Sequence, residues 1–154
     1  MIDIPNYKTL TITHIVCDYN GTIATDGSVH STIKALFEKL SQNYKIHVIT
    51  ADTFGSVHKE LENYPVIIKV LNSNNHTQEK ADYITSLGAS ESVAIGNGNN
   101  DAAMLKEASI GIVLLGDEGC SSSILISADL ICKSIENALE LFLYPKRLIA
   151  TLRR

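Results

Sequence analysis

The chain has 154 residues, of which 45% are hydrophobic and 19% are charged, and its formal net charge is −4. This length fits one domain with a sizeable core, and the charge balance argues against a nucleic-acid-binding surface. No apolar run reaches membrane-spanning length, the start does not resemble a signal peptide, and the three cysteines lack metal spacing. We therefore expect a cytoplasmic protein with no nucleic-acid or membrane partner.

The first third of the chain predicts two strands, a flap and a helix. Residues 2–4 and 8–17 are expected to be strands, the first of them a short N-terminal strand or one arm of a hairpin. Residues 23–28 have the composition of a turn-rich flap. A helix is expected over 31–42, because apolar residues recur there on one face.

The remaining segments alternate between strands and helices. Strands are expected over 46–50, 66–71, 93–95, 110–115 and 130–132, and helices over 53–62, 77–87, 102–108, 121–127 and 134–143, with a last helix opening at Pro145. This alternation predicts an α/β fold with a parallel sheet and helices on both faces. No repeat or linker divides the chain, so residues 1–154 are expected to form a single domain.

A carboxylate ends the most apolar of the early strands. Asp18 follows a β-branched run, and Asn20-Gly21 then marks a sharp turn. Alone, this pattern is more typical of a turn-initiating aspartate than of a functional one. Because open α/β sheets bind ligands at the carboxyl ends of their strands, the functional interpretation depends on the residues that end the other strands.

Two further strands also end in polar residues. Thr50 ends the strand expected over 46–50, and a glycine-rich loop with Asn97, Asn100 and Asp101 comes after the strand expected over 93–95. Lys80, on a predicted helix, could reach the same edge. A carboxylate nucleophile, a hydroxyl and an ammonium for phosphate oxygens, and oxygen ligands for a hard cation suit phosphoryl transfer. Each residue has a structural explanation by itself, as a cap, a solvated lysine or a turn, but their joint occurrence favours a site.

The order of these residues resembles the four motifs of the haloacid dehalogenase-like (HAD) superfamily over nearly the whole chain. The segment Asp18-Tyr19-Asn20-Gly21-Thr22 is similar to the Asp-Lys-Thr-Gly-Thr signature of P-type ion pumps, and Gly98-Asn99-Asn100-Asp101-Ala102 is similar to their hinge motif. With residues 144–154, these segments most resemble the soluble P-type ATPase-like group. The resemblance implies a Rossmann-like three-layer sandwich without a cap domain.

The resemblance also implies roles for individual residues in a Mg²⁺-dependent phosphatase. Asp18 would form an aspartyl-phosphate, with Asn20 and Lys80 as its catalytic neighbours. The residues implied in phosphate binding are Thr50, Ala51, Gly21 and Lys80. The residues implied in metal binding are Asp18, Asn20 through its main-chain carbonyl, Asn97 and Asp101.

Two positions depart from the common pattern of the superfamily. Asn20 stands where phosphatases usually carry an aspartate that acts as general acid and base, and an amide cannot transfer a proton. General acid–base catalysis contributes about 10²–10⁴-fold, so slow hydrolysis is expected. Asn97 stands where an aspartate is common, which removes one charge from the expected metal site. The alternative is a weakly active or inactive module that senses phosphate or binds protein.

The segments between the motifs are too short for a cap or for the nucleotide-binding domain of the pumps. The expected site is therefore open, and it either accepts a bulky phosphorylated substrate or is covered by a neighbouring subunit in a homo-oligomer. None of the five histidines is assigned as a ligand, because they are scattered along the chain. The residues do not identify the substrate.

Overall fold

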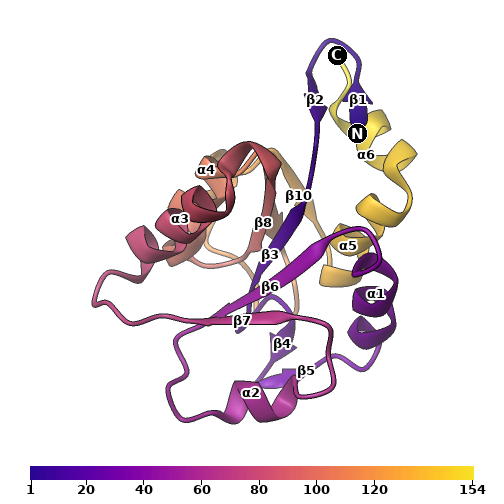
Figure 1. Cartoon of the computed structure of the whole chain (residues 1–154). Helices are drawn as coiled ribbons and strands as arrows, with labels where there is room; N and C mark the ends of the chain where they lie inside the picture. The colour runs from indigo at the N-terminus through magenta and orange to yellow at the C-terminus, as the bar shows by residue number, and fades with distance from the viewer.

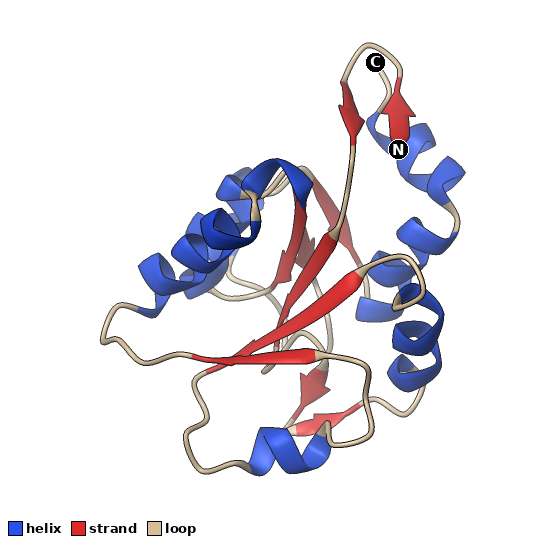
Figure 2. Ribbon diagram, in the orientation of Figure 1, coloured by secondary structure: helices blue, strands red, loops and turns tan.

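The computed structural model describes residues 1–154, and its centre is a six-stranded sheet in which every neighbouring pair of strands is parallel. The strands lie in the order β10-β9-β8-β3-β6-β7 (Figures 1 and 2). In chain order they are β3 (His14–Asp18), β6 (Lys45–Thr50), β7 (Ile67–Val70), β8 (Ser92–Gly96), β9 (Ile110–Leu114) and β10 (Leu130–Cys132). The predicted parallel sheet is confirmed.

Helices cover both faces of this sheet, which confirms the three-layer α/β sandwich. The helices α1 (Ile33–Leu40) and α5 (Ile135–Leu143) lie on one face, and α3 (His76–Leu87) and α4 (Ala102–Glu107) on the other (Figure 1). Side chains alternate accordingly along β3: Ile15 and Cys17 are buried in the core under α1 and α5, and Val16 in the core under α3 and α4.

The order of the strands creates a crevice beside β3. The chain passes from β3 to β6 and β7 on one side, and then returns to place β8 and β9 on the other. Connections that diverge in this way leave an opening at the carboxyl edge, where α/β proteins bind ligands. Asp18, the last residue of β3, lies at this edge.

Only short segments connect to the strands at this edge. The predicted flap is a small hairpin of β4 (Ala24–Thr25) and β5 (Ser28–Val29), and the segment between β6 and β7 holds only the short helix α2 (Ser56–Glu60). The structure therefore has no cap domain, as predicted.

The strand predicted over residues 8–17 is divided in two. Its first part, β2 (Lys8–Leu10), pairs antiparallel with β1 (Ile2–Ile4) in a separate hairpin, and β3 starts only at His14. The two parts satisfy their hydrogen bonds in different sheets, which residue pattern alone does not reveal. The hairpin packs against α6 (Pro145–Leu152), so the two chain ends lie together (Figure 1).

The helix predicted over 53–62 is shorter than expected because Asp52 holds the preceding turn. Its carboxylate accepts hydrogen bonds from the amides of Phe54 and Val57, both at 3.0 Å, and from the Ser56 hydroxyl at 2.7 Å. Gly55, with φ of 83°, cannot continue into a helical turn, and α2 begins after it. These hydrogen bonds lower the pKa of Asp52 to about 2.

The helix ends predicted from capping residues agree better with the structure. Ser134 caps α5 by accepting a hydrogen bond from the Asn137 amide at 3.2 Å, and Gly88 ends α3 with φ of 104°. Residues 122–127 form 3₁₀ turns in place of the predicted short α-helix, and further 3₁₀ turns lie at Ala89–Glu91 and Asn99–Asp101.

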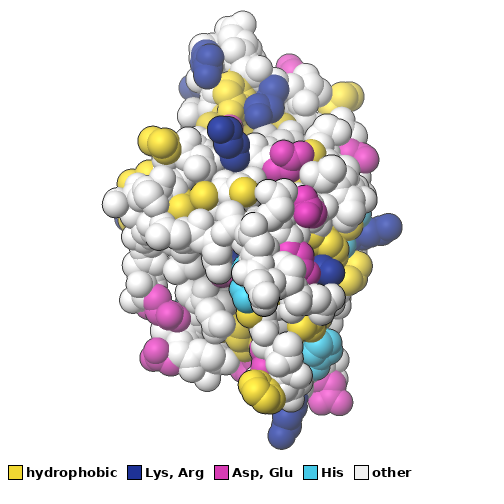
Figure 3. Space-filling view, turned by 90° about the vertical axis from the view of Figure 1, so that its left-hand side faces the viewer, with side chains coloured by type: hydrophobic (Ala, Val, Ile, Leu, Met, Phe, Trp, Pro, Cys, Tyr) yellow, Lys and Arg dark blue, Asp and Glu magenta, His cyan; other side chains and the backbone are white.

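None of the helices combines the length and the apolar character that crossing a bilayer requires. Several of the Lys and Arg side chains visible in Figure 3 lie at the end of the molecule that carries the chain termini. Arg154 belongs to this end: its amide donates to the carbonyl of Pro5 at 3.1 Å, and its guanidinium lies over the ring of Tyr7.

A buried histidine, His47, lies under α3 and is expected to make the stability of this fold dependent on pH. His47 is 2% exposed, with Nε2 at 2.9 Å from Nδ1 of His14 and Nδ1 at 2.7 Å from the hydroxyl of Tyr83. Burial, then the nearby charges of His14 and Lys45, lower the His47 pKa to about 4. Since the unfolded chain keeps a histidine pKa near about 6.5, it binds the proton more readily than the folded chain does.

Stability is therefore expected to fall as the pH drops from about 6.5 to about 4, with His47 contributing up to about 3 kcal/mol of that loss. Urea unfolding of wild type and His47→Gln at pH 7, 5.5 and 4.5 measures this contribution. The variant should have the shallower dependence on pH, whereas His58→Gln, at an exposed position on α2, should match wild type. Parallel curves for wild type and His47→Gln would contradict the assignment.

Candidate active site

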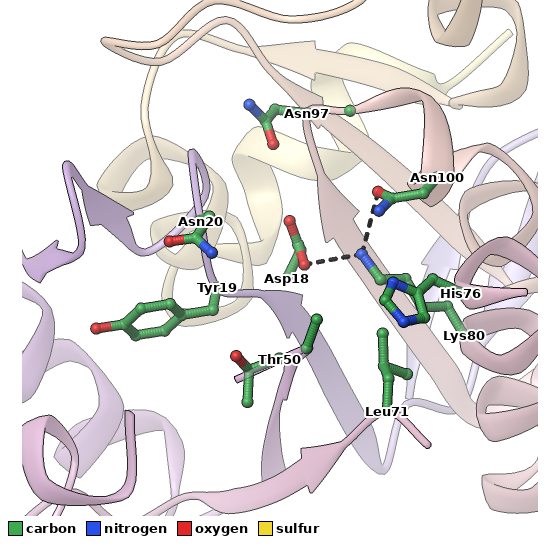
Figure 4. A pocket seen from close by; sticks show the side chains of 11 residues that line it. Asp18, Tyr19, Asn20, Thr50, Leu71, His76, Lys80, Asn97 and Asn100 are labelled. Atoms are coloured by element: carbon green, nitrogen blue, oxygen red, sulfur yellow. Dashed lines mark hydrogen bonds and ion pairs between the residues drawn. The ribbon is translucent and has the colours of Figure 1, made fainter. Parts of the chain in front are cut away.

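The polar residues that end the strands surround one cavity at the carboxyl edge of the sheet (Figure 4). Asp18 ends β3, Thr50 ends β6, and Asn97 comes directly after β8. The cavity has a volume of about 190 Å³. Its lining consists of Asp18, Tyr19, Asn20, Thr50, Ala51, Leu71, His76, Lys80, Asn97, Gly98 and Asn100.

A buried lysine joins the two carboxylates of this region. Nζ of Lys80 lies 2.9 Å from Oδ1 of Asp18 and 2.8 Å from Oδ1 of Asp101, and it also donates to Oδ1 of Asn100 at 3.2 Å. Because Lys80 is only 2% exposed, these bonds replace the water that its ammonium would otherwise bind. The structure thus brings Asp18, Lys80 and Asp101 together from β3, α3 and the loop after β8.

The ion pairs do not offset the whole free-energy cost of burying these charges. Burial raises the pKa of Asp18, and the negative charge of Asp101 raises it further, against the opposing effect of Lys80. For Lys80, burial lowers the pKa, but Asp18 and Asp101 together outweigh burial and the net shift is upward. A site that holds two carboxylates and one ammonium has an excess of negative charge, which favours a further cation.

Asp101 organises the loop after β8. Its Oδ2 accepts hydrogen bonds from the amides of Asn97 and Gly98, both at 3.0 Å, while Oδ1 accepts from Lys80. The side chain is fully buried and does not line the cavity. Gly96 is required beside it, because a Cβ at that position would come within 2.5 Å of the Asp101 carboxyl group. Asp101, which the resemblance implies in metal binding, thus engages both of its carboxylate oxygens in hydrogen bonds within the protein.

The turn after Asp18 packs directly on this loop. Gly21 has φ of 76°, its amide donates to the carbonyl of Ala24 at 2.9 Å, and a Cβ on it would overlap the side chain of Asn97. Only glycine fits this position. Gly21, predicted to contact phosphate, does not line the cavity, whereas Asn20 does.

Thr50 and Ala51 form the wall contributed by β6. Thr50 is 2% exposed, and its Oγ1 accepts a hydrogen bond from the amide of Asp52 at 3.0 Å. The hydroxyl hydrogen of Thr50 remains available for a ligand oxygen at the cavity surface. Both residues line the cavity, next to Asp18.

The cavity also contains residues that were not predicted as site residues. His76 lines it from the start of α3, Leu71 from the residue after β7, and Tyr19 from the turn beside Asp18. Asn100, expected at this edge of the sheet, also lines the cavity. For His76 a local signal exists in its spacing, because it precedes Lys80 by four residues and therefore shares its helix face. For Leu71 and Tyr19 no such signal exists.

A metal ion bound to the Asp18 carboxylate would find further oxygen donors in the neighbouring Asn20 and Asn97. Figure 4 shows the amide oxygen of Asn97 directed toward the Asp18 carboxylate from above, with Asn20 to the left of that carboxylate. The amide nitrogen of Asn97 is turned away and donates to the carbonyl of Gly119 at 3.1 Å. No group of three or more His, Cys, Asp or Glu side chains is arranged to hold a metal. The donor set fits a hard cation such as Mg²⁺, which accepts carboxylate, amide and carbonyl oxygens.

No protein-family model matches the chain. An uncharacterised protein of Methanocaldococcus jannaschii is 51% identical over 61 residues, which are 40% of this chain and 66% of that protein. The chain thus spans just under two thirds of the length of this curated relative.

Solved structures with a similar fold include phosphatases. The cobalt-bound deoxy-D-mannose-octulosonate 8-phosphate phosphatase of Haemophilus influenzae has a TM-score of 0.73 at 13% identity, over 87% of this chain and 88% of that one. The 3-deoxy-D-manno-octulosonate 8-phosphate phosphatase of Moraxella catarrhalis, in complex with magnesium, phosphate and KDO, has a TM-score of 0.73 at 18% identity, over 93% and 94%.

A putative HAD superfamily hydrolase (subfamily III A) of Legionella pneumophila has a TM-score of 0.72 at 16% identity, over 91% of this chain and 86% of that one. At such low identity these similarities concern the fold alone, and they agree with the parallel sheet and the cavity at its carboxyl edge. The chain therefore has the fold of the haloacid dehalogenase-like (HAD) superfamily hydrolases.

Proposed function

We propose that this chain is a Mg²⁺-dependent phosphohydrolase or phosphotransferase that acts through an aspartyl-phosphate on Asp18. The observation that carries the proposal is the Asp18 carboxylate at the cavity surface, with the Lys80 ammonium 2.9 Å away and Thr50 beside it. An ammonium paired to two buried carboxylates is unfavourable for stability alone, so its presence at a ligand-sized cavity favours function. The phosphatases among the structural neighbours support the same class of reaction.

In the first step, an oxygen of Asp18 attacks phosphorus and displaces the leaving oxygen. Lys80 and the Thr50 hydroxyl bind phosphoryl oxygens, and the Ala51 amide and the turn at Asn20 border the same space. A bound Mg²⁺ would neutralise charge between the carboxylate and the phosphoryl group. The Asp18 carboxylate, the Asn20 carbonyl and the Asn97 amide oxygen are its proposed ligands. We assign Asp101 to holding Lys80 and the loop.

In the second step, water attacks the phosphoryl group and releases phosphate from Asp18. Asn20 cannot take the proton from this water, so the phosphoenzyme is expected to be longer-lived than one with an aspartate at that position. The asparagine at position 20 and the sequences of the motifs support placement of the chain in the soluble P-type ATPase-like group. We propose a small phosphorylated substrate in the cytoplasm.

The open cavity also fits a homo-oligomer in which a second subunit covers it. The hairpin β4–β5 and the helix α2 are the only segments inserted after the strands beside the cavity. A sharply monodisperse monomer in solution would count against such an assembly.

The test is phosphoenzyme formation. The purified protein is incubated with Mg²⁺ and labelled acetyl phosphate, and acid-stable, hydroxylamine-labile label is measured with and without EDTA. Metal-dependent label supports the proposal. The absence of both label and phosphate release, from folded protein with Mg²⁺ present, would shift the assignment to the alternative, a phosphate-sensing or protein-binding module. The amides at positions 20 and 97 are the observations that favour this alternative.

Asn20→Asp is expected to accelerate release of phosphate from the phosphoenzyme. The new carboxylate stands where it can take the proton of the attacking water, and general base catalysis is worth about 10²–10⁴-fold, so a gain of at least about 10-fold is expected. Decay of the isolated label after removal of acetyl phosphate measures this rate, and Asn20→Ser serves as the control without a proton acceptor. An unchanged decay rate in Asn20→Asp would show that proton transfer does not limit this step.

A further inference from the structure

The proposed reaction lacks a proton donor for the leaving oxygen and a proton acceptor for the attacking water. The side chain of Asn20 can supply neither. Besides Asp18 itself, the cavity lining contains three side chains with a titratable proton: Tyr19, His76 and Lys80. One of these three must serve if the reaction is to have general acid–base catalysis from within the cavity.

Tyr19 and Lys80 are poorly suited to this role. The Tyr19 hydroxyl donates to the carbonyl of Gly27 at 2.8 Å, and burial, together with the charges of Glu60 and Asp52, raises its pKa to about 12. Lys80 is held between two carboxylates, which keep its pKa above the ordinary value. Neither gives up and regains a proton readily near neutral pH.

His76 stands at the wall of the cavity with its imidazole free. It is the first residue of α3, one helical turn before Lys80, and Figure 4 shows its ring next to the Lys80 side chain. Residues four apart share one helix face, so the position that brings Lys80 to Asp18 also brings His76 to the space above it. Unlike His14, His30 and His47, which are hydrogen-bonded to other side chains, His76 has no such partner.

The backbone around His76 is held in place. The Asn75 side chain caps α3 by accepting from the amide of Gln78 at 3.2 Å. The Glu79 carboxylate accepts from the amides of Asn72 and Ser73 at 2.9 and 2.7 Å, which fixes the preceding loop. An imidazole that is half-exposed on an ordered helix start can meet a substrate without rearrangement of the loop.

We propose that His76 is the general acid and base of the reaction at Asp18, in the role that Asn20 leaves vacant. This inference rests on the proposed function. It predicts that the natural substrate has an unactivated leaving group, such as the alkoxide of a phosphate monoester, because only such a group needs a proton when its bond to phosphorus breaks.

One proton leaves His76 and one returns to it in each full reaction cycle. As Asp18 attacks phosphorus, the bond from phosphorus to the leaving oxygen breaks, and the imidazolium of His76 gives its proton to that oxygen to form an alcohol. The neutral imidazole then takes a proton from water while the water oxygen attacks phosphorus. The bond between Asp18 and phosphorus breaks, which releases hydrogen phosphate and restores both the carboxylate and the imidazolium.

The first experiment compares wild type with His76→Gln, loaded with label from acetyl phosphate in the presence of Mg²⁺. Acetate leaves without a proton, so both proteins should form phosphoenzyme at the same rate. Decay of the label should be about 10²-fold slower in the variant, and added free imidazole should restore part of the lost decay rate. His58→Gln, a histidine variant at an exposed position outside the cavity, should behave as wild type.

Two outcomes would overturn the role of His76. One is equal decay of label in wild type and His76→Gln. The other is a wild-type phosphoenzyme that decays no faster than the same label on denatured protein, since no group then assists the water. Failure of the proposed function is distinct from both, because wild type would then form no label at all.

A second experiment separates acid–base catalysis from mere contact with the substrate. With β-glycerophosphate, an alkyl phosphate, His76→Gln should lower kcat by about 10²-fold and leave KM within about 3-fold of wild type. In the double variant Asn20→Asp/His76→Gln the label should decay at least as fast as in wild type, since the new carboxylate replaces the imidazole. A rise in KM at constant kcat, with no gain in the double variant, would make His76 a binding residue only.

Discussion

Asp18→Asn is expected to abolish formation of phosphoenzyme and to leave the fold intact. An amide is a far weaker nucleophile than a carboxylate, and removal of a nucleophile commonly costs about 10³-fold or more in turnover. The amide oxygen of asparagine can still accept the hydrogen bond from Lys80 that Oδ1 of Asp18 accepts at 2.9 Å. Label from acetyl phosphate and steady release of phosphate, both measured with Mg²⁺, should fall to background.

The same substitution should not destabilise the protein. Burial and the neighbouring Asp101 raise the pKa of Asp18, so its charged form is less favourable in the folded chain than in the unfolded one. The neutral amide avoids this penalty, and we expect a free energy of unfolding within about 1 kcal/mol of wild type, or above it. Urea unfolding at pH 7.5 measures it. Substantial residual label in a well-folded Asp18→Asn protein would show that another group is the nucleophile.

Lys80→Met is expected to have the largest effect on stability. Without the ammonium, the carboxylates of Asp18 and Asp101, which it contacts at 2.9 and 2.8 Å, remain buried without a counter-charge. Breaking a buried ion pair by removing one partner costs about 3–5 kcal/mol. Because burial and Asp101 raise the pKa of Asp18, protonation of Asp18 should make the loss smaller at pH 5 than at pH 7.5, and Mg²⁺ should reduce it at pH 7.5.

Lys69→Met provides a matched control for this variant. Nζ of Lys69 lies 3.7 Å from Oε2 of Glu79, and both side chains are partly exposed. Such a pair contributes at most about 1 kcal/mol. Urea unfolding of both variants, with and without Mg²⁺, measures the difference, and the double variant Asp18→Asn/Lys80→Met should recover part of the loss. Equal losses for the two lysine variants would mean that the charge cluster does not govern stability.

Much of the fold could be predicted from the sequence because its signals are local. The period of apolar residues distinguishes strands from helices, and single residues such as Ser134 and Gly88 mark helix ends through hydrogen bonds within one turn. The predictions were wrong where hydrogen bonds from outside a segment determine its structure. The strand predicted over residues 8–17 is divided because its two parts pair in different sheets. The helix α2 is shorter than predicted because Asp52, which precedes it, holds the turn before it.

The sequence by itself determined which chemical groups stand at the strand ends, since Asp18, Thr50 and Asn97 each come directly after an apolar run. Only the tertiary structure decided how these groups meet. It buried Asp101 behind the loop, held Lys80 between two carboxylates and placed His76 at the cavity. The spacing of four residues puts His76 and Lys80 on one face of α3, but it does not specify how that face and the loop after β8 pack against β3, because this packing is between segments distant in the chain.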